Sequence, residues 1–414
     1  MNSQADANSN AVIVRPGQLP DTRALPYFIR MLLPVAARLE WGGVTLILPD
    51  GRVIEIEGRN AGKHAELTIR DYACLWRLVR TGNLGFAEGY LAQEWDTPDL
   101  TAVLEVFARN ADQMRELYEG KWWAKLANRG LHVFNRNTRA GARRNIYAHY
   151  DLGNAFYERW LDPGMTYSSA KFEKPEQTLT EAQRNKYASL AASIGLVPEH
   201  RLLEIGCGWG GFAEYAAKEI GCAVTGITIS REQHDFAKRR LQAAGLAGKA
   251  DIRLEDYRDT QGTFDRIASI EMFEAVGEEY WPAYFDKIHA LLAPSGQAGL
   301  QIITIDERYF GAYRKSVDFI QKYVFPGGML PSMQALRDQV ARAGLSWRAD
   351  TTFGEDYAQT LASWRNRFQA AWDDIRTLGF DDQFKRMWNY YLSYCEAGFR
   401  AGSIDVTQIA VART

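Results

Sequence analysis

The sequence predicts an α/β protein in which a doubly wound parallel sheet follows a smaller α+β domain. Strand-like and helix-like segments alternate from Arg201 to Ile305, which is typical of a parallel sheet with helices on its faces. Four glycines lie between an apolar run and a helical pattern at residues 202–212, as in a turn that binds a nucleotide-like ligand. An Asp-Gly turn at residues 50–51 separates two apolar runs and predicts a β-hairpin in the first domain.

The composition is that of an ordinary globular protein. The chain has 414 residues, 46% of them apolar, which is enough for a sizeable core in two or three domains. Lysine and arginine total 49 against 51 acidic residues, so any basic partner surface has to be local. The four cysteines lack metal-ligand and disulfide spacing, and predict packed, reduced thiols in a cytosolic protein without a metal site. Neither a signal peptide nor a membrane-spanning run is visible, which predicts a soluble or peripheral protein.

Residues 1–24 have little periodicity and predict a mobile tail, and residues 25–120 are expected to form the α+β domain. Leu25 to Trp41 predicts an amphipathic helix that Pro34 bends or ends. The other predicted elements are strands at residues 44–48, 52–56 and 65–69 and helices at residues 72–80 and 86–94. This domain has no cluster of catalytic residue types, so we expect it to bind or position a partner.

Residues 121–144 form a basic linker with interleaved aromatic residues. The basic residues, with no acidic residue among them, are Lys121, Lys125, Arg129, Arg136, Arg139, Arg143 and Arg144. Trp122, Trp123 and Phe134 lie between them, and such side chains cost free energy when left in water. The composition favours contact with a membrane interface, while single-stranded nucleic acid and a solvated linker remain alternatives.

Residues 145–414 are expected to form the larger domain. Its predicted strands lie at residues 202–205, 223–227, 251–254, 264–270 and 299–305, with helices that follow residue 211, Ser230 and Glu279. Residues 355–400 are helical and rich in aromatic side chains, most of which suit a core and some an apolar substrate channel. Ligands are expected at the carboxyl ends of the strands.

The glycine turn fits two classes of cofactor. Gly206, Gly208 and Gly211 have the spacing of a dinucleotide-binding turn. A dinucleotide site also needs a carboxylate at the end of the second strand, and none occurs before Glu232 in the next helix. Glu204 lies before the turn and suits a ligand with an ammonium group, such as S-adenosylmethionine.

Six motifs occur in order around this turn. They are His149 to Asn154, Met165 to Ser169, Glu204 to Gly211, Thr228 to Gln233, Asp256 to Asp259 and Met272 to Glu274. Together they resemble the cyclopropane-fatty-acyl-phospholipid synthases and mycolic acid methyltransferases, and the resemblance runs from about Leu25 to the C-terminus. It implies a Rossmann-like class I methyltransferase sheet that uses S-adenosylmethionine, and an N-terminal α+β lipid-binding domain. It also implies a cytoplasmic enzyme, peripheral at the inner face of the membrane, whose partner is an unsaturated phospholipid rather than nucleic acid; a homodimer is compatible with it.

The resemblance assigns the cofactor site residue by residue. It implies that Tyr167 and Ser168 meet the methionine end of the cofactor, that Gly206, Gly208 and Gly210 cradle it beside Glu204, that Thr228 and Gln233 hold its ribose, and that Asp256 and Tyr257 lie beside adenine. The tyrosines could instead be packed rings, and Thr228 and Gln233 a helix cap and its companion.

Members of this family transfer a methyl group from a sulfonium to a cis double bond. An alkene is a poor nucleophile, so the enzyme has to align it in a dry pocket and stabilise a developing carbocation. Glu274 and Tyr357 match family positions that help to hold bicarbonate, the proposed base that closes the ring. A capping acid and a core aromatic are the alternative readings of these two residues.

The chain departs from the ring-forming pattern in three places. Ser169 replaces a cysteine, Gln301 replaces a histidine, and Glu271 is added next to a motif in which Ala275 replaces another histidine. Serine and glutamine still donate hydrogen bonds to an anion, but Glu271 adds a like charge that disfavours bicarbonate. Glu271 or Glu274 could take the proton instead. We therefore expect methylation of an unsaturated phospholipid acyl chain that gives a cyclopropane or a methyl-branched unsaturated chain, with a methylene product as a third outcome if a hydride shift precedes proton loss. An inactive lipid carrier and an NAD-dependent oxidoreductase are the alternatives.

Overall fold

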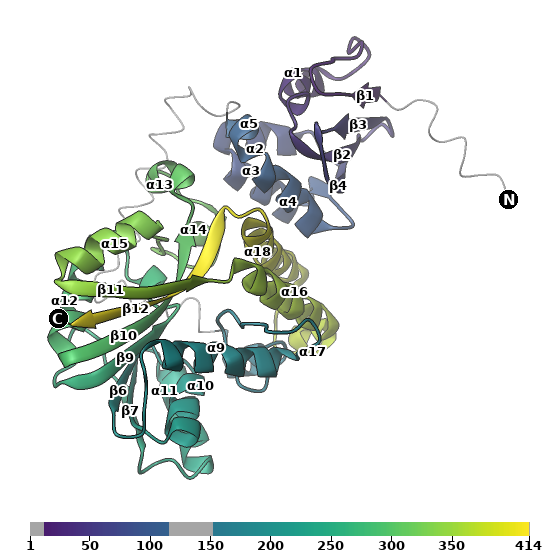
Figure 1. The fold of residues 1–414 in the computed structure, drawn as a ribbon. Coiled ribbons are helices and arrows are strands. Elements are labelled where there is room, and N and C mark those ends of the chain that lie inside the picture. The colour runs from purple at the N-terminus through teal and green to yellow at the C-terminus, as the bar shows by residue number, and fades with distance from the viewer. Residues whose placement is uncertain (1–11, 116–151, 414) are drawn as a thin grey trace. The chain divides into compact units, whose positions relative to one another are not determined.

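The computed structural model describes residues 12–115 and 152–413, and the chain divides into two compact units (Figure 1). The first unit contains the described part of residues 1–128 together with Asp381–Ser403, and the second contains the rest. The division differs from the predicted boundaries, because helix α18 (Asp382–Arg400) packs on α4 (Leu100–Arg109) within the first unit. Within that unit, Thr101 donates a hydrogen bond to Glu396. The helical pattern of residues 382–400 predicts a buried face but not the element that covers it.

The first unit is an α+β fold around a five-stranded sheet of order β1-β3-β2-β4-β5. The strands are β1 (Val12–Val14), β2 (Trp41–Ile47), β3 (Val53–Glu57), β4 (Asn60–Ile69) and β5 (Trp95–Asp96), and the other helices are α1 (Tyr27–Ala36), α2 (Ala73–Thr81), α3 (Asn83–Leu91) and α5 (Ala111–Arg115). The predicted hairpin of β2 and β3 is confirmed, with Gly51 at φ +84° in its turn. The third predicted strand is also present as β4, parallel to β2.

Four sequence expectations need correction or lie wholly or partly beyond the described residues. The expectation of a mobile tail is wrong for Val12–Val14, because these residues pair in parallel with β3 and bury Val14. A three-residue strand is too short to show a periodicity, so this pairing depends on contacts that the local sequence does not reveal. The helix predicted to Trp41 ends at Ala36, two residues after Pro34, and Trp41 begins β2. The basic linker at 121–144 and residues 149–151 of the first motif lie outside the described residues.

The second unit contains a seven-stranded sheet of order β11-β12-β10-β9-β6-β7-β8 (Figure 1). Its strands are β6 (Arg201–Ile205), β7 (Ala223–Thr228), β8 (Ala250–Leu254), β9 (Phe264–Ile270), β10 (Leu292–Ile305), β11 (Leu345–Thr352) and β12 (Ile404–Arg413). Every predicted strand is present. The five predicted strands run parallel to one another, as predicted. Strands β11 and β12 were not predicted, and β12 runs antiparallel to β10 and β11. An apolar run identifies a strand but carries no sign of its direction.

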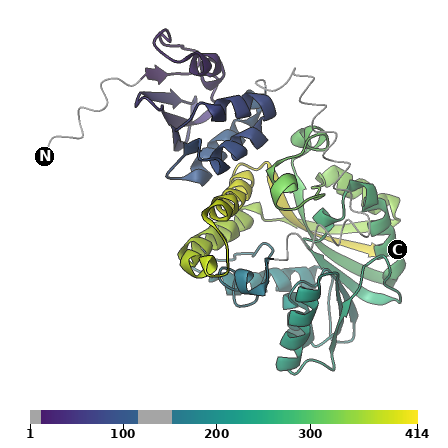
Figure 2. The ribbon, with the colours of Figure 1, turned by 180° about the vertical axis from the view of Figure 1, so that it is seen from behind.

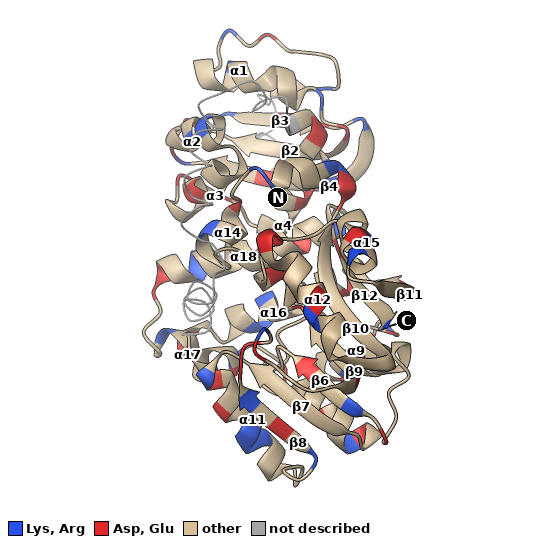
Figure 3. Ribbon diagram, turned by 90° about the vertical axis from the view of Figure 1, so that its left-hand side faces the viewer, with Lys and Arg blue, Asp and Glu red and all other residues tan. Residues whose placement is uncertain are grey.

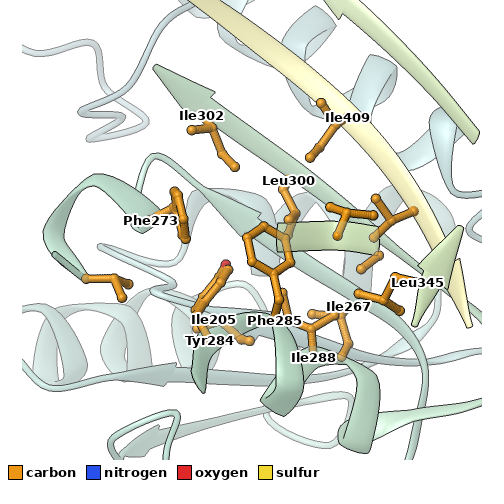
Figure 4. Packing of buried hydrophobic residues seen from close by; sticks show 14 of the residues in the cluster. Ile205, Ile267, Phe273, Tyr284, Phe285, Ile288, Leu300, Ile302, Leu345 and Ile409 are labelled. Carbon is orange, nitrogen blue, oxygen red and sulfur yellow. The ribbon is translucent and has the colours of Figure 1, made fainter. Parts of the chain in front are cut away.

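Helices cover both faces of this sheet, as Figure 2 shows from behind. The helices and short turns are α8 (Asn154–Tyr157), α9 (Leu179–Ser193), α10 (Gly211–Tyr215), η1 (Ala216–Ile220), α11 (Arg231–Ala243), η2 (Phe273–Ala275), η3 (Glu278–Tyr280), α12 (Trp281–Leu291), α13 (Glu307–Tyr313), α14 (Phe319–Tyr323), α15 (Met333–Arg342), α16 (Gly354–Ala370) and α17 (Trp372–Arg376). Helices α9, α10 and α11 pack on one face, and α12 and α15 on the other. In Figure 4 the rings of Phe273, Tyr284 and Phe285 lie against the strand residues Ile205 and Leu300. The core thus fixes the strand ends from which the candidate site is built.

Charges of both signs are spread over the surface, for example along α11 (Figure 3). No helix within residues 12–115 or 152–413 is long and apolar enough to cross a membrane. Three of the four cysteines, all within these ranges, are buried and all four are free, as the sequence predicted.

Candidate active site

The glycine turn between β6 and α10 keeps one side open. Gly206, Gly208 and Gly210 have φ angles of +80°, +52° and +83°, which favour glycine. A Cβ added at Gly206 would lie 2.6 Å from Met272 Cγ, and one at Gly210 would lie 3.0 Å from Ala237 Cβ. A Cβ at Gly208 would meet no described atom within 4 Å. Gly206 and Gly210 are therefore required by packing, whereas Gly208 borders space that a ligand can fill.

Gly208→Ala is expected to weaken S-adenosylhomocysteine binding about tenfold, because the added methyl occupies the space beside the turn. The matched control is Gly245→Ala, since Gly245 also has a positive φ (+71°) and no described atom within 4 Å of an added Cβ. Both variants should lose about 1 kcal/mol of stability from backbone strain. Calorimetry measures the affinity and thermal unfolding measures the stability. Equal affinities of the two variants would contradict a ligand at this turn.

Glu204, on β6 just before the turn, is a buried carboxylate with spare hydrogen-bonding capacity. Its side chain is 2% exposed, and no partner among the described residues hydrogen-bonds to its Oε2 atom. Burial raises the pKa of Glu204 to about 8, although the Lys186 ammonium opposes that shift. An unpaired buried oxygen is costly, so this atom fits a ligand that brings a cationic donor.

The groups at the next two strand ends are engaged with one another. Thr228 Oγ1 donates to Gln233 Oε1 at 3.0 Å, while Ser230 caps α11 by accepting from the Gln233 backbone at 3.3 Å. After β8, Asp256 accepts two hydrogen bonds from the Arg258 guanidinium. Tyr257 meets Tyr284 edge-on with its ring centroid 5.4 Å away. Capping and packing thus account for the described contacts of these residues, and the ribose and adenine assignments stay predictions.

Tyr167 and Ser168 lie between an aromatic cluster and a buried lysine. The Tyr167 ring is 5.6 Å from Trp160 and 5.3 Å from Trp364, centroid to centroid. Ser168 Oγ accepts a hydrogen bond from Lys186 Nζ at 2.6 Å. Aromatic faces attract cations, so this cluster can favour a sulfonium or a carbocation.

Glu271 is the centre to which most of the predicted catalytic residues converge. Tyr357 OH donates to its Oε2 atom at 2.6 Å, and Gln301 Nε2 donates to its Oε1 atom at 2.7 Å. The backbone N–H of Ser169 also donates to Oε1, at 2.8 Å. Burial raises the pKa of Glu271, and the charge of the Lys186 ammonium is the strongest of the effects that lower it. Glu271 has a positive φ of +48° and keeps some accessible surface, as a group that meets a substrate must.

Glu274, the fifth predicted catalytic residue, has other contacts. Its Oε1 atom accepts from the backbone N–H of Ile303, and its Oε2 atom is buried without a hydrogen-bond partner among the described residues. Burial, and then the neighbouring Glu271, raise its pKa to about 8.

The Ser169 hydroxyl points away from Glu271, because it donates to Ala170 O at 2.8 Å. Ser169 therefore offers its backbone rather than the side chain that the sequence suggested.

Two polar residues of the site were missed from the sequence. Lys186 on α9 is fully buried, and burial lowers its pKa to about 8. Gln408 on β12 is 3% exposed and donates from Nε2 to Gln301 Oε1 at 3.0 Å. The sequence did contain a sign of the buried Lys186. This lysine is at helical spacing from Gln183 and Leu190, on the apolar side of residues 179–193. No local sequence pattern indicated a role for Gln408, because its partner Gln301 is 107 residues away.

The order of the seven strands, the glycine turn after β6 and the site at the carboxyl ends of the strands define a class I methyltransferase fold. A sequence model of the mycolic acid cyclopropane synthetase family matches residues 137–409. The chain belongs to this family, which confirms the resemblance predicted from the motifs. Membership of this methyltransferase family does not support the alternative of an NAD-dependent oxidoreductase.

Individual relatives agree with this assignment. A tuberculostearic acid methyltransferase from Mycobacterium tuberculosis is 40% identical over 347 residues, which are 81% of this chain and 80% of the relative. A cyclopropane-fatty-acyl-phospholipid synthase from Escherichia coli is 34% identical over 357 residues, 86% of this chain and 89% of the relative. The crystal structure of a mycolic acid cyclopropane synthase, complexed with SAH and CTAB, matches with a TM-score of 0.61 and 31% identity over 65% of this chain and 98% of that one. SAH is S-adenosylhomocysteine, so this neighbour agrees with the cofactor predicted from the sequence.

Proposed function

We propose that this protein transfers a methyl group from S-adenosylmethionine to a cis double bond in a phospholipid acyl chain, with Glu271 as the base that removes the final proton. The observation that carries the proposal is the carboxylate of Glu271, which accepts hydrogen bonds from Tyr357, Gln301 and Ser169. These donors include the positions at which ring-forming relatives are expected to hold bicarbonate. A side-chain carboxylate here supplies the base within the protein.

The residues around the glycine turn fit the cofactor. Gly208 leaves open space beside the backbone, and the unpaired Oε2 atom of Glu204 can accept from the ammonium group of the methionine moiety. Tyr167, packed against Trp160 and Trp364, lies next to Ser168 and can face the positive sulfonium. When bound, S-adenosylmethionine supplies an electrophilic methyl group.

The chain's own residues then have two tasks. The aromatic cluster stabilises the positive charge that develops on one alkene carbon when the other carbon gains the methyl group. Glu271 removes a proton from the chain carbon next to the carbocation, and the electron pair of the broken C–H bond forms the π bond of the new double bond. The lipid gains one CH2 in total. The proton is held by the carboxylate until solvent removes it.

The product that we propose is a methyl-branched unsaturated chain. Two observations support this product: the chain lacks the cysteine and histidine of the ring-forming pattern at Ser169 and Gln301, and the tuberculostearic acid methyltransferase is more similar to it than the cyclopropane synthase of Escherichia coli. Loss of a proton from a chain carbon leaves a double bond, whereas loss from the new methyl closes a ring. A cyclopropane is therefore the competing outcome.

Transfer of label from methyl-labelled S-adenosylmethionine to phospholipid tests this function. Vesicles of a cis-monounsaturated phospholipid should become labelled, and vesicles with the same headgroup and saturated chains should not. A protein that binds S-adenosylhomocysteine but labels neither lipid would be an inactive carrier, and the proposal would then fail. Label in both lipids would instead indicate a headgroup methyltransferase.

Peripheral membrane contact belongs to the proposal, and the first unit offers a surface for it. Tyr27 on α1 and Trp76 on α2 are 71% and 58% exposed, and Phe28 lies edge-on to Trp76 at 5.3 Å. Helix α1 contains Arg30 but no acidic residue, and it is almost free of charge in Figure 3. Aromatic rings with a neighbouring arginine suit an anionic membrane surface.

Replacing both exposed aromatics, in Tyr27→Ser/Trp76→Ser, is expected to weaken binding to anionic vesicles by about tenfold or more, because each ring contributes apolar area to the lipid contact. Leu378→Ser is the matched control, since Leu378 is also exposed (40%) but lies in the second unit. Vesicle flotation measures the effect. Unchanged flotation of the double variant would assign membrane contact to another part of the chain.

A further inference from the structure

A chain of polar side chains runs from Lys171 to Glu271 within the second unit. Lys171 Nζ donates to Ser189 Oγ at 2.7 Å, and Ser189 Oγ donates to Gln408 Oε1 at 2.8 Å. Gln408 Nε2 donates to Gln301 Oε1 at 3.0 Å, and Gln301 Nε2 donates to Glu271 Oε1 at 2.7 Å. All four hydrogen bonds are donated in the same direction, toward the carboxylate.

The chemistry of its members fixes this direction. An ammonium group can only donate, so Ser189 has to accept from Lys171, which leaves its single proton for Gln408 Oε1. The NH2 group of Gln408 also donates to the backbone O of Lys186 at 3.1 Å. A carbonyl oxygen can only accept, so this bond independently requires the same amide orientation. Gln301 must therefore turn its oxygen to Gln408 and its NH2 to the carboxylate.

The two carboxylate oxygens of Glu271 consequently differ. Oε1 accepts from Gln301 Nε2 at 2.7 Å and from the Ser169 backbone N–H at 2.8 Å, and neither donor can act as an acceptor in this orientation. Oε2 accepts from the Tyr357 hydroxyl at 2.6 Å, a group that can either donate or accept. A proton can thus reside on Oε2 once Tyr357 rotates, but not on Oε1.

We propose that Gln408, oriented by Ser189 and Lys171, is a positioning residue that locks Gln301 as a donor and confines proton uptake to the Oε2 atom of Glu271. This inference rests on the proposed function, in which Glu271 is the base. When the C–H bond of the methylated intermediate breaks, its electron pair forms the π bond of the new double bond and the proton goes to Oε2. The lock keeps the basic lone pair aimed in one direction and stabilises the ionised form of the base.

The groups that face Glu271 set its pKa, and a change in that pKa would reveal the loss of the Gln408–Gln301 hydrogen bond. Burial raises the pKa of Glu271, while Lys186 on α9, Tyr357 on α16, and the Ser169 and Gln301 donors lower it. Glu274 on η2 interacts with Glu271 as a like charge. If Gln301 can turn, the carboxylate loses a fixed donor and its pKa rises further. The base acts in its ionised form. On acidification, activity would therefore fall off at a higher pH than in the wild type.

The test is the pH dependence of kcat/KM. In Gln408→Met, which removes the amide at similar size, we expect the acidic limb to move up by about one pH unit, with a roughly tenfold lower rate near that limb. Ser189→Ala removes the group that sets the direction and should shift the limb the same way by less. Ser193→Ala is the control, since the Ser193 hydroxyl on the same helix donates to Leu190 O at 2.8 Å, outside the chain of bonds. S-adenosylhomocysteine affinity should be unchanged in all three.

The failures of the two proposals are distinguishable. If Glu271→Gln is inactive but Gln408→Met and Ser189→Ala keep the wild-type pH profile, the positioning role is overturned and the proposed function stands. If Glu271→Gln keeps full activity, the assigned base is wrong and the positioning role falls with it. Should Gln408→Met fail to fold, Ser189→Ala decides the question.

Discussion

Glu271→Gln is expected to lower the rate of methylation of a cis-monounsaturated phospholipid by about 10² to 10⁴, the range that a general base typically contributes. The fold should tolerate the change. The new amide oxygen can accept from Gln301 and Ser169, while its NH2 donates to the Tyr357 hydroxyl. The loss would therefore be one of proton transfer rather than of geometry. Steady-state rates, with S-adenosylhomocysteine affinity as a check on the cofactor site, measure it.

Glu274→Gln is the matched control for this prediction. Glu274 is also a deeply placed glutamate beside the site, but its described hydrogen bond goes to the Ile303 backbone. A glutamine oxygen can accept the same bond, so the rate should stay within a few-fold of wild type. If Glu274→Gln were inactive and Glu271→Gln active, the two carboxylates would exchange roles and the account of the site would be wrong.

Glu204→Gln is expected to weaken binding of S-adenosylhomocysteine by about 10²-fold, because a buried charge-assisted hydrogen bond to its ammonium group is lost. The same variant should be more stable without ligand. The pKa of Glu204 rises from 4.5 to about 8 on folding, so ionising it between those values opposes the folded state. Wild-type stability should accordingly fall over this pH range, and Glu204→Gln should lack that component of the loss.

Proton release gives this prediction a second readout. At pH 7 Glu204 is largely protonated in the free protein, since its pKa is about 8. An ammonium beside it would favour the carboxylate, so binding should release up to about one proton from this group. Calorimetry in buffers of different ionisation enthalpy counts the protons, and the Glu204→Gln variant should release correspondingly fewer. Glu274→Gln should also be stabilised but should bind normally; equal affinities of the two variants would contradict the ammonium site.

Local sequence was sufficient for the framework of the catalytic unit. The strand predicted at 264–270 has those bounds in the structure, and the turn at Gly206 to Gly210 has the positive φ angles that only glycine adopts easily. These features depend on neighbours along the chain, so a pattern reveals them. The departures at Ser169, Glu271 and Gln301 were also visible, and the structure brings all three within hydrogen-bonding distance.

What local sequence could not provide depends on pairings between distant residues. Gln408 donates to the Lys186 backbone across 222 positions, and no periodicity predicts that contact. The direction of β12 and the packing of α18 on α4 are set in the same way, by what covers an apolar face. The choice of the Ser169 backbone over its hydroxyl is a matter of local geometry that residue identity does not carry.

The most direct test of the central claim is to react the protein with S-adenosylmethionine carrying a trideuterated methyl group and a cis-monounsaturated phospholipid. If Glu271 removes a proton from the acyl chain, the product gains one methyl that keeps all three deuterium atoms, and proton NMR shows a branched alkene. Ring closure would keep two deuterium atoms and give high-field cyclopropane signals, which would contradict the proposed product. A lipid of unchanged mass would contradict methylation itself.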